Sequence, residues 1–471
     1  MQFSIVNYQA ALREERFDSE YHKPKYIQLD KALTSKNFIP LAETKPYIKC
    51  GPFGSTILSS TYSDVGIIVA RPFNINGMMF GSGEIVKIPK IDVVEKNLKI
   101  FRPKDILFSR VGDVRCGVIP ENFEEVTLSP NVIALRIKSD DFNPYYLTVF
   151  FNSKYGFPQI ERGLKVVAQP TISTELIKNL KVVLLSKNFQ CLIEKLFLLS
   201  IRSRHDSKLL YFQAEQLLLS ELGLADWQPQ YQSTFVKNYS DTQGAERIDA
   251  DCFLPKYDHI ISKITKYGKT TRLVDNFKIT KSKGISYDEL GKTGVIKTKQ
   301  LKKDFINFDV ESYSIVDTYL VEDKDVLFAS MGVGSLGKTN IFYEFESGDK
   351  LTTDSTIRVL RKKINSQFKP EVLKVFMSSW VGQELIYQNI IGSSGIISLN
   401  DSYLNKLLLP QLPSDLANKI ENDVKDAHIN HRNSKSLLEI AKLGVEKAIE
   451  ENEEVAERWI ERELGKLGVT L

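Results

Sequence analysis

The chain has 471 residues, of which 42% are hydrophobic and 26% charged, and its formal net charge at pH 7 is +4. This apolar content excludes a disordered chain or a fibre, and the length predicts more than one domain. The nearly balanced charge means that any basic surface is local. The four cysteines show no C-x-x-C pairing, which indicates neither a zinc site nor a disulfide framework.

The N-terminal sequence gives no sign of export. Met1-Gln-Phe-Ser-Ile5 lacks a basic region that leads into an apolar core, and the most apolar segment, 191–201, is interrupted by Glu194 and Lys195. We therefore expect no membrane span, a cytoplasmic location and reduced thiols.

The opening of the chain recurs in its second half. Arg16-Phe-Asp-Ser-Glu-Tyr-His-Lys-Pro-Lys-Tyr26 aligns without a gap with Arg247-Ile-Asp-Ala-Asp-Cys-Phe-Leu-Pro-Lys-Tyr257. Farther on, Asp105-Ile-Leu-Phe108 recurs as Asp325-Val-Leu-Phe328, and the step 172–180 recurs at 399–407. A period this long predicts a tandem duplication of a domain and not a solenoid.

Two short motifs suggest enzymes. Gly332–Thr339 reads GVGSLGKT and matches the phosphate-binding pattern G-x-x-x-x-G-K-T. The residues that follow, 340–345, favour a strand where such a loop needs a helix. The counterpart Gly112–Ile119 keeps both outer glycines but has no Lys or Thr. We interpret both segments as glycine turns between strands, with an NTPase as the alternative.

The second motif is Asn143-Pro-Tyr-Tyr146, close to the N-P-P-[FWY] signature with which amino-methyltransferases hold a flipped base. Its second Pro is absent, and the counterpart near Pro370 keeps only the Pro. We predict that Pro144 and Pro370 each begin a helix, with an adenine methyltransferase as the alternative.

Two stretches, 188–222 and 415 to about 464, predict long amphipathic helices with apolar stripes at equivalent positions. The predicted helix–helix interface consists of Phe189, Ile193, Phe197, Leu210, Ala214 and Leu218 with Leu416, Ile420, Val424, Leu437, Ala441 and Val445. We expect an antiparallel coiled coil with a pseudo-twofold axis. The alternative is that each helix packs only on its own domain.

The rest of the chain reads as short strands separated by glycine turns, with a helix after Pro144 or Pro370, which predicts an α+β fold. The expected divisions are an N-terminal segment (1–40), a first domain (41–185), a central helix (186–224), a linker with the second repeat opening (225–272), a second domain (273–412) and a C-terminal helix (413–466).

Positive side chains that suit contact with nucleic-acid phosphates gather locally. In the lysine-rich stretch 277–303 the candidates are Lys281, Lys283, Lys297, Lys299, Lys302 and Lys303. In the first domain they are Lys49, Arg71, Arg110, Arg115, Arg162 and Lys165, together with the polar Ser55. A solvated loop is the alternative for each of them.

In this order, and twice, these features resemble the specificity subunit of type I restriction-modification systems, a bacterial defence system. The carriers are the repeated R-x-D-x-[DE] and Pro-Lys-Tyr openings, Gly51-Pro-Phe-Gly-Ser55, the repeated Asp-[IV]-Leu-Phe strand, and the step into each long helix. The resemblance covers Arg16 to Leu464. The second half lacks a Gly-Pro-Phe-Gly equivalent and has Thr280–Gly284 near that place.

The resemblance implies two target-recognition domains that read the halves of a bipartite site in double-stranded DNA, with the paired helices as spacer. It implies no catalysis, metal or cofactor in this chain. The partners would be two methyltransferase subunits, which use S-adenosylmethionine, and restriction subunits, which use ATP and Mg. A coiled-coil scaffold that does not bind DNA is the alternative outside the enzymes.

Overall fold

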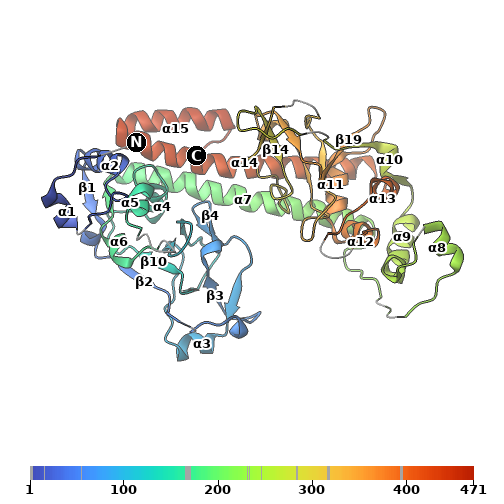
Figure 1. Cartoon of the computed structure of the whole chain (residues 1–471), viewed down its shortest axis with the longest axis horizontal. Coiled ribbons are helices and arrows are strands. Elements are labelled where there is room, and N and C mark those ends of the chain that lie inside the picture. Colours follow the sequence, from blue (N-terminus) through green and yellow to red (C-terminus); the bar gives the residue numbers. More distant parts are fainter. Residues whose placement is uncertain are drawn as a thin grey trace. The chain divides into compact units, whose positions relative to one another are not determined.

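The computed structural model describes residues 4–14, 16–54, 56–164, 171–230, 232, 234–245, 247–282, 285–315, 319–392 and 396–471. The chain divides into two compact units. Unit 1 consists of Met1–Ser203 and Asn433–Leu471, and unit 2 consists of Arg204–Arg432. Both units contain part of α7 (Lys187–Glu221) and part of α14 (Ser414–Glu450), the two long helices of Figure 1. The combination of sheets and helices confirms the α+β class.

The described part of unit 1 contains sheets in the orders β1-β11, β2-β10-β7-β8-β5-β4 and β6-β3-β9. Their strands are β1 (Phe38–Pro40), β2 (Tyr47–Cys50), β3 (Ile67–Ala70), β4 (Ile75–Asn76), β5 (Met79–Phe80), β6 (Val86–Ile88), β7 (Ile106–Ser109), β8 (Cys116–Val118), β9 (Val126–Leu128), β10 (Val132–Arg136) and β11 (Lys181–Val183). The pairs β10–β2, β10–β7 and β7–β8 are antiparallel, whereas β3 and β9 are parallel.

Unit 2 has the orders β12-β20, β13-β19-β16-β17 and β15-β14-β18, which repeat those of unit 1, except that its described part has no counterparts of β5 and β4 beside β17. Its strands are β12 (Thr270–Arg272), β13 (Phe277–Thr280), β14 (Thr293–Ile296), β15 (Tyr313–Ser314), β16 (Val326–Ala329), β17 (Thr339–Ile341), β18 (Leu351–Thr353), β19 (Ile357–Lys362) and β20 (Leu408–Pro410). The pair β14–β18 is parallel, like β3–β9. The duplication seen in the sequence is therefore a duplication of sheet topology.

Shorter helices complete both units. Unit 1 has α1 (Tyr8–Glu14), α2 (Pro24–Thr34), α3 (Lys90–Glu95), α4 (Pro144–Phe151), α5 (Phe157–Arg162), α6 (Thr174–Lys178), α15 (Glu453–Leu467) and the 3-10 turns η1 (Leu41–Thr44), η2 (Ser59–Thr61) and η3 (Pro72–Asn74). Unit 2 has α8 (Tyr239–Ala245), α9 (Pro255–Tyr267), α10 (Leu273–Asn276), α11 (Pro370–Ser378), α12 (Trp380–Gln388), α13 (Asp401–Lys406), η4 (Ala250–Phe253) and η5 (Glu344–Glu346).

The predicted helix starts at Pro144 and Pro370 are confirmed, since each is the first residue of its helix. The side chain of Asn143 caps α4 by accepting a hydrogen bond from the backbone N–H of Tyr145 at 2.9 Å. The rings of Tyr145 and Tyr146 are buried. The segment that resembles a methyltransferase motif is thus a packed and capped helix start.

In each unit a serine hydroxyl of α7 joins the two long helices. In unit 1 the Ser200 hydroxyl donates to the carbonyl of Ser434 at 2.8 Å, and in unit 2 the Ser207 hydroxyl donates to the carbonyl of Ala427 at 2.8 Å. In the repeat, Ser200 corresponds to Ala427 and Ser207 corresponds to Ser434. In both units the bond therefore connects the same two positions of the repeat. The position that α7 supplies in one unit is supplied by α14 in the other.

The apolar stripes of both helices enter the cores of the units. Phe189, Ile193, Phe197, Leu437, Ala441 and Val445 are buried in the main core of unit 1, Ala214, Leu218, Ile420 and Val424 are buried in that of unit 2, and Leu210 and Leu416 are partly buried against the latter.

The expectation of one C-terminal helix to about Leu464 is wrong, because α14 ends at Glu450 and α15 begins at Glu453. Asn452 has extended backbone, and its side chain accepts from the N–H of Val455 at 3.0 Å, which starts a new helix. The α15 helix lies beside the last part of α14 (Figure 1), where a Cβ on Gly444 would stand 2.7 Å from Ile460.

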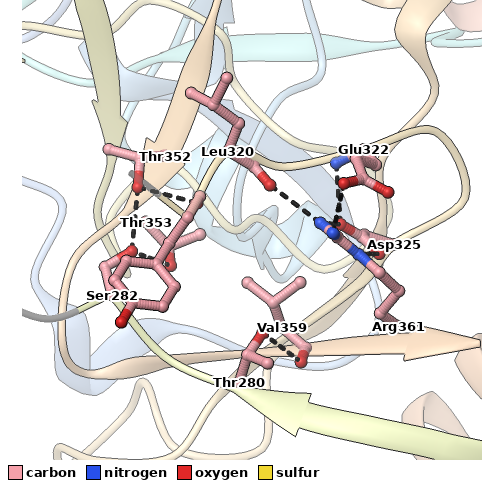
Figure 2. Close-up of polar contacts among 10 residues, drawn as sticks. Thr280, Ser282, Leu320, Glu322, Asp325, Thr352, Thr353, Val359 and Arg361 are labelled. Atoms are coloured by element: carbon pink, nitrogen blue, oxygen red, sulfur yellow. Dashed lines mark hydrogen bonds and ion pairs between the residues drawn. The ribbon is translucent and has the colours of Figure 1, made fainter. Parts of the chain in front are cut away.

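In each unit an ion pair between a buried aspartate and a partly exposed arginine connects the strands. The Arg136 guanidinium donates twice to Asp105, at 2.7 and 2.6 Å, and Arg361 donates twice to Asp325, at 3.0 and 2.7 Å. Figure 2 shows the second ion pair, in which Arg361 also donates to the carbonyl of Leu320. Burial raises the pKa of Asp325, and the bonds from Arg361 oppose this shift.

We predict that Arg361→Ala destabilises unit 2 by about 3 kcal/mol, because it leaves the buried Asp325 carboxylate without its charge partner. Urea unfolding followed by fluorescence in a Trp459→Phe background measures this, since Trp227 and Trp380 both lie in unit 2 and Trp459 lies in unit 1. The control is Lys299→Ala, which removes an exposed ion pair and should change stability by less than about 0.5 kcal/mol. Equal losses in the two variants would contradict a stabilising role for the Arg361–Asp325 pair.

Candidate nucleic-acid interface

Several loops of unit 1 meet at one edge of its sheets. Strand β2 ends at Cys50, opposite Ile133 near the start of β10, and β7 ends at Ser109, opposite Val132. The loops 51–54, 110–115 and 129–131 therefore lie at the same edge. The turn after β3 joins them, because the N–H of Ser129 donates to the carbonyl of Ala70 at 2.9 Å. We call residues 49–54, 71–74, 110–115 and 129–131 the loop edge of unit 1.

Unit 2 has the corresponding edge. Strand β13 ends at Thr280, opposite Val359, and β16 ends at Ala329, opposite Ile357. The turn after β14 joins through a hydrogen bond from the N–H of Asp354 to the carbonyl of Ile296 at 3.0 Å. We call residues 281–282, 297–300, 330–338 and 354–356 the loop edge of unit 2.

The start of this second edge is fixed by hydroxyl groups (Figure 2). The Ser282 hydroxyl lies 2.9 Å from the hydroxyl of Thr352, and Thr280 donates to the carbonyl of Val359 at 3.4 Å. Ser282 is buried, so the chain leaves β13 in a defined direction next to Lys281.

The structure brings several sequence candidates together on these edges. They are Lys49, Arg71, Arg110 and Arg115 in unit 1 and Lys281 and Lys297 in unit 2. Lys49 is exposed on β2, and the Arg115 side chain is about two fifths exposed beside Asp113 at 3.4 Å. Each edge thus presents positive side chains, which suits contact with a phosphate backbone.

Arg71 and Lys297 occupy the same place in the two units. The backbone N–H of Arg71 donates to the side chain of Asn74 at 3.1 Å, and that of Lys297 donates to the side chain of Gln300 at 3.1 Å. In return, the N–H of Asn74 and that of Gln300 donate to the carbonyls of Arg71 and Lys297. One turn geometry therefore carries a cation on both loop edges.

Aromatic rings and polar atoms hold these two cations. The Arg71 guanidinium lies 4.2 Å from the ring of Phe73 and donates to the carbonyl of Glu84 at 2.6 Å. The Lys297 amine lies 4.9 Å from the ring of Tyr287 and donates to the Ser312 hydroxyl at 2.7 Å. Both side chains are positioned by the protein before any ligand binds.

Arg162 lies elsewhere. It pairs with Asp30, donates to the carbonyl of Tyr21 at 2.8 Å and stacks on the Tyr21 ring at 4.0 Å, with only 12% of its side chain exposed. These bonds fasten the N-terminal segment to α5.

Of the other lysine candidates in unit 2, Lys299 lies on the loop edge, where it pairs with Glu311 at 2.6 Å. Lys302 and Lys303 lie outside that edge. Lys302 and Lys303 are exposed on the turn before Phe305, and the Phe305 ring stacks on His431 of α14 at 3.7 Å. Ser55, Lys165 and Lys283 lie outside the described residues.

The segment that resembles a phosphate-binding loop forms part of the unit 2 edge. The predicted strand–turn–strand is confirmed, because β16 and β17 are antiparallel and β17 begins at Thr339. The N–H of Ala329 donates to the carbonyl of Lys338 at 2.9 Å, and Gly332, Gly334 and Gly337 have positive φ. A strand takes the place of the helix that would point its N-terminus at a phosphate.

Sequence reasoning missed the exposed apolar side chains of the loop edges. Phe53 is 70% exposed in unit 1, and Met331 and Val333 are exposed in unit 2. An aromatic residue between two glycines, four residues after Lys49, was the signal available for Phe53.

No protein-family model matches the chain, and no curated protein matches it. Among solved structures, the S subunit of a type I restriction-modification system from M. genitalium is 12% identical with a TM-score of 0.39, covering 92% of this chain and 96% of that chain. The HsdS subunit from Thermoanaerobacter tengcongensis is 13% identical with a TM-score of 0.28, covering 88% and 97%. Both neighbours are type I specificity subunits.

Among the described residues, no group of three or more His, Cys, Asp and Glu side chains could hold a metal ion. No helix in that part of the chain is long and apolar enough to cross a membrane.

We predict that the double variant Lys281→Ala, Lys297→Ala lowers the salt dependence of DNA binding. Each lost phosphate contact reduces the slope of log K against log salt by about 0.9, so the slope should fall by about 1.8. Fluorescence anisotropy with double-stranded DNA over a salt series measures it. The matched control is Lys302→Ala, Lys303→Ala, which should keep the wild-type slope. A lower slope in the Lys302, Lys303 variant and a wild-type slope in the Lys281, Lys297 variant would place the DNA-binding face on the turn before Phe305.

Proposed function

We propose that this chain is the non-catalytic DNA specificity subunit of a type I restriction-modification complex. Each unit would read one half of a bipartite target through its loop edge. The observation that carries the proposal is the contrast between the two edges: their backbone frames are equivalent, whereas the side chains on them differ. A duplicated backbone that carries different side chains on its two loop edges suits a target whose halves are unrelated in sequence.

Within this proposal, residues 41–185 and 273–412 are the target-recognition domains, and the helical regions 186–224 and 413–466 form the spacer. Residues 1–40 and 225–272 are the repeated openings. The 35 residues of α7 are about 50 Å long at 1.5 Å per residue. Half-sites one DNA turn apart are separated by about 34 Å, which a helix of this length can span.

Both enzyme-like motifs form ordinary structural elements, a capped helix start and a hairpin turn, which supports a non-catalytic chain. The Asn143 amide caps α4 and donates to Glu194 at 2.7 Å, and Lys338 stands directly before β17 in a hairpin. We propose that S-adenosylmethionine, ATP and Mg are used by partner subunits, two for methylation and others for restriction.

Experiments with the purified chain separate this proposal from its rivals. Salt-dependent binding to a specific DNA, without hydrolysis of ATP and without methyl transfer, is the expected result. ATP hydrolysis by the chain alone would support an NTPase, and methyl transfer would support a methyltransferase. A chain that binds no DNA would be a scaffold. Methylome sequencing of cells that carry the chain and its partners should yield one bipartite motif.

The spacer role predicts a change in the gap of that motif. Because α7 and α14 bond to each other in both units, four residues should be inserted in each helix, after Ser203 and after Arg432. The gap should lengthen by about 6 Å, or about two base pairs at 3.4 Å each. The helix faces rotate by only about 40° at 3.6 residues per turn, so the apolar stripes stay aligned.

Methylome sequencing of cells with this variant measures the gap, and both half-sites should keep their letters. The control inserts four residues in α7 alone, which shifts one helix against the other and should lower the unfolding midpoint. Altered half-site letters with an unchanged gap would show that the helices take part in base reading and do not set the spacing.

A further inference from the structure

The loop edge of unit 1 presents an exposed aromatic ring. Phe53 is 70% exposed, and it lies between Gly51 and Gly54. A Cβ on Gly51 would stand 2.0 Å from the carbonyl oxygen of Ser129, so the backbone is packed where only glycine fits. Gly54 has φ +70°, which reverses the chain directly after the ring. The ring is therefore exposed on a turn that is anchored at Gly51, at a place where it adds nothing to the core.

A guanidinium group lies over this ring. The Arg110 Cζ atom is 4.6 Å from the centroid of the Phe53 ring. The Arg110 backbone is bonded on both sides, since its N–H donates to the carbonyl of Asn131 at 2.8 Å and its carbonyl accepts from Ile172 at 3.0 Å. Its guanidinium donates a long hydrogen bond from Nη1 to the carbonyl of Pro130 at 3.4 Å and interacts with the Cys50 thiol. Since a guanidinium has five N–H donors, these two contacts leave donors for a ligand.

Arg110 differs from its neighbours in charge pairing. Arg71, Arg102, Arg115, Arg136 and Arg162 each have a carboxylate oxygen within 3.5 Å. Across the described residues, no Asp or Glu forms such an ion pair with Arg110. Its positive charge is thus uncompensated at the edge where a polyanion would bind.

The geometry suits base reading better than phosphate binding. A guanidinium fork pairs with the O6 and N7 atoms of guanine in the major groove, and this pairing requires a defined plane. Stacking on an aromatic ring fixes that plane, whereas a phosphate can be contacted by a cation in many orientations. We propose that Arg110 reads a guanine in the half-site of unit 1 and that Phe53 is the positioning residue that orients it. This inference rests on the proposed function.

Comparison of the two repeats shows that unit 2 has no arginine equivalent to Arg110. Ser330 stands at the position of Arg110, since its carbonyl accepts from the N–H of Leu399 at 2.9 Å as that of Arg110 accepts from Ile172. The Ser330 side chain is 1% exposed and donates to the carbonyl of Thr356 at 2.9 Å. Unit 2 thus has the same backbone hydrogen bond at this position but no guanidinium. A substitution at Arg110 should therefore affect one half-site and leave the other unchanged.

The test measures binding of the full chain to its motif DNA and to a panel in which each base pair is replaced in turn. Wild type should prefer guanine at one G·C pair of one half-site by about 10- to 100-fold. In Arg110→Ala this preference should fall below about 2-fold, with every other position unchanged. Phe53→Leu keeps the charge and should reduce discrimination at that same pair only.

The matched control is Arg102→Ala, which removes an exposed arginine from the opposite end of β7 and should change nothing. A uniform loss of affinity in Arg110→Ala, with a slope lower by about 0.9, would make Arg110 a phosphate contact and overturn the inference. Full guanine preference in that variant would also overturn it while leaving the proposed function intact. Wild-type chain that binds no DNA specifically would overturn both.

Discussion

The packing of α7 against α14 is the interaction on which both cores depend. Neither unit closes its core with its own sheets alone, because the main core of each includes side chains from both long helices. Small hydroxyl side chains allow the close approach, and the Ser200 and Ser207 hydroxyls are satisfied by carbonyls of the opposite helix. An inserted residue in one helix would therefore misplace buried groups in the other, which ties the register of the pair to the folding of each unit.

Each long helix has a glutamate that accepts a hydrogen bond from the residue before α4 or α11. The positions of these two contacts are equivalent in the repeat, but the donor groups differ. In unit 1 the Asn143 amide donates to Glu194 of α7, and in unit 2 the Lys369 amine donates to Glu421 of α14, both at 2.7 Å. Unit 2 adds Lys324, which pairs with Glu421, so an amide contact has become a small ionic cluster. Divergence of this kind shows that placement of the donor, more than its charge, is what the fold requires.

The sequence predicted what local pattern controls. The bounds of α7, the helix starts at Pro144 and Pro370 and the hairpin at Gly332–Thr339 follow from periodicity, proline geometry and glycine turns. The break at Asn452 was missed, because a single side-chain cap decides it within a sequence that otherwise favours a helix. The loop edges were beyond sequence reasoning, since they depend on strand register, as does the equivalence of Arg71 with Lys297. The partner of Arg162, Asp30, lies too far away in the chain for any pattern to reveal it.

The make-up of unit 1 has a consequence for synthesis on the ribosome. Unit 2 is one uninterrupted stretch, whereas unit 1 is completed by Asn433–Leu471. A nascent chain that has emerged only as far as Arg432 can already close the core of unit 2, but Phe189 and Ile193 still lack the α14 residues that cover them. The first half to be translated is thus the last to mature, and its apolar helix face stays open to water and to chaperones until the final segment arrives.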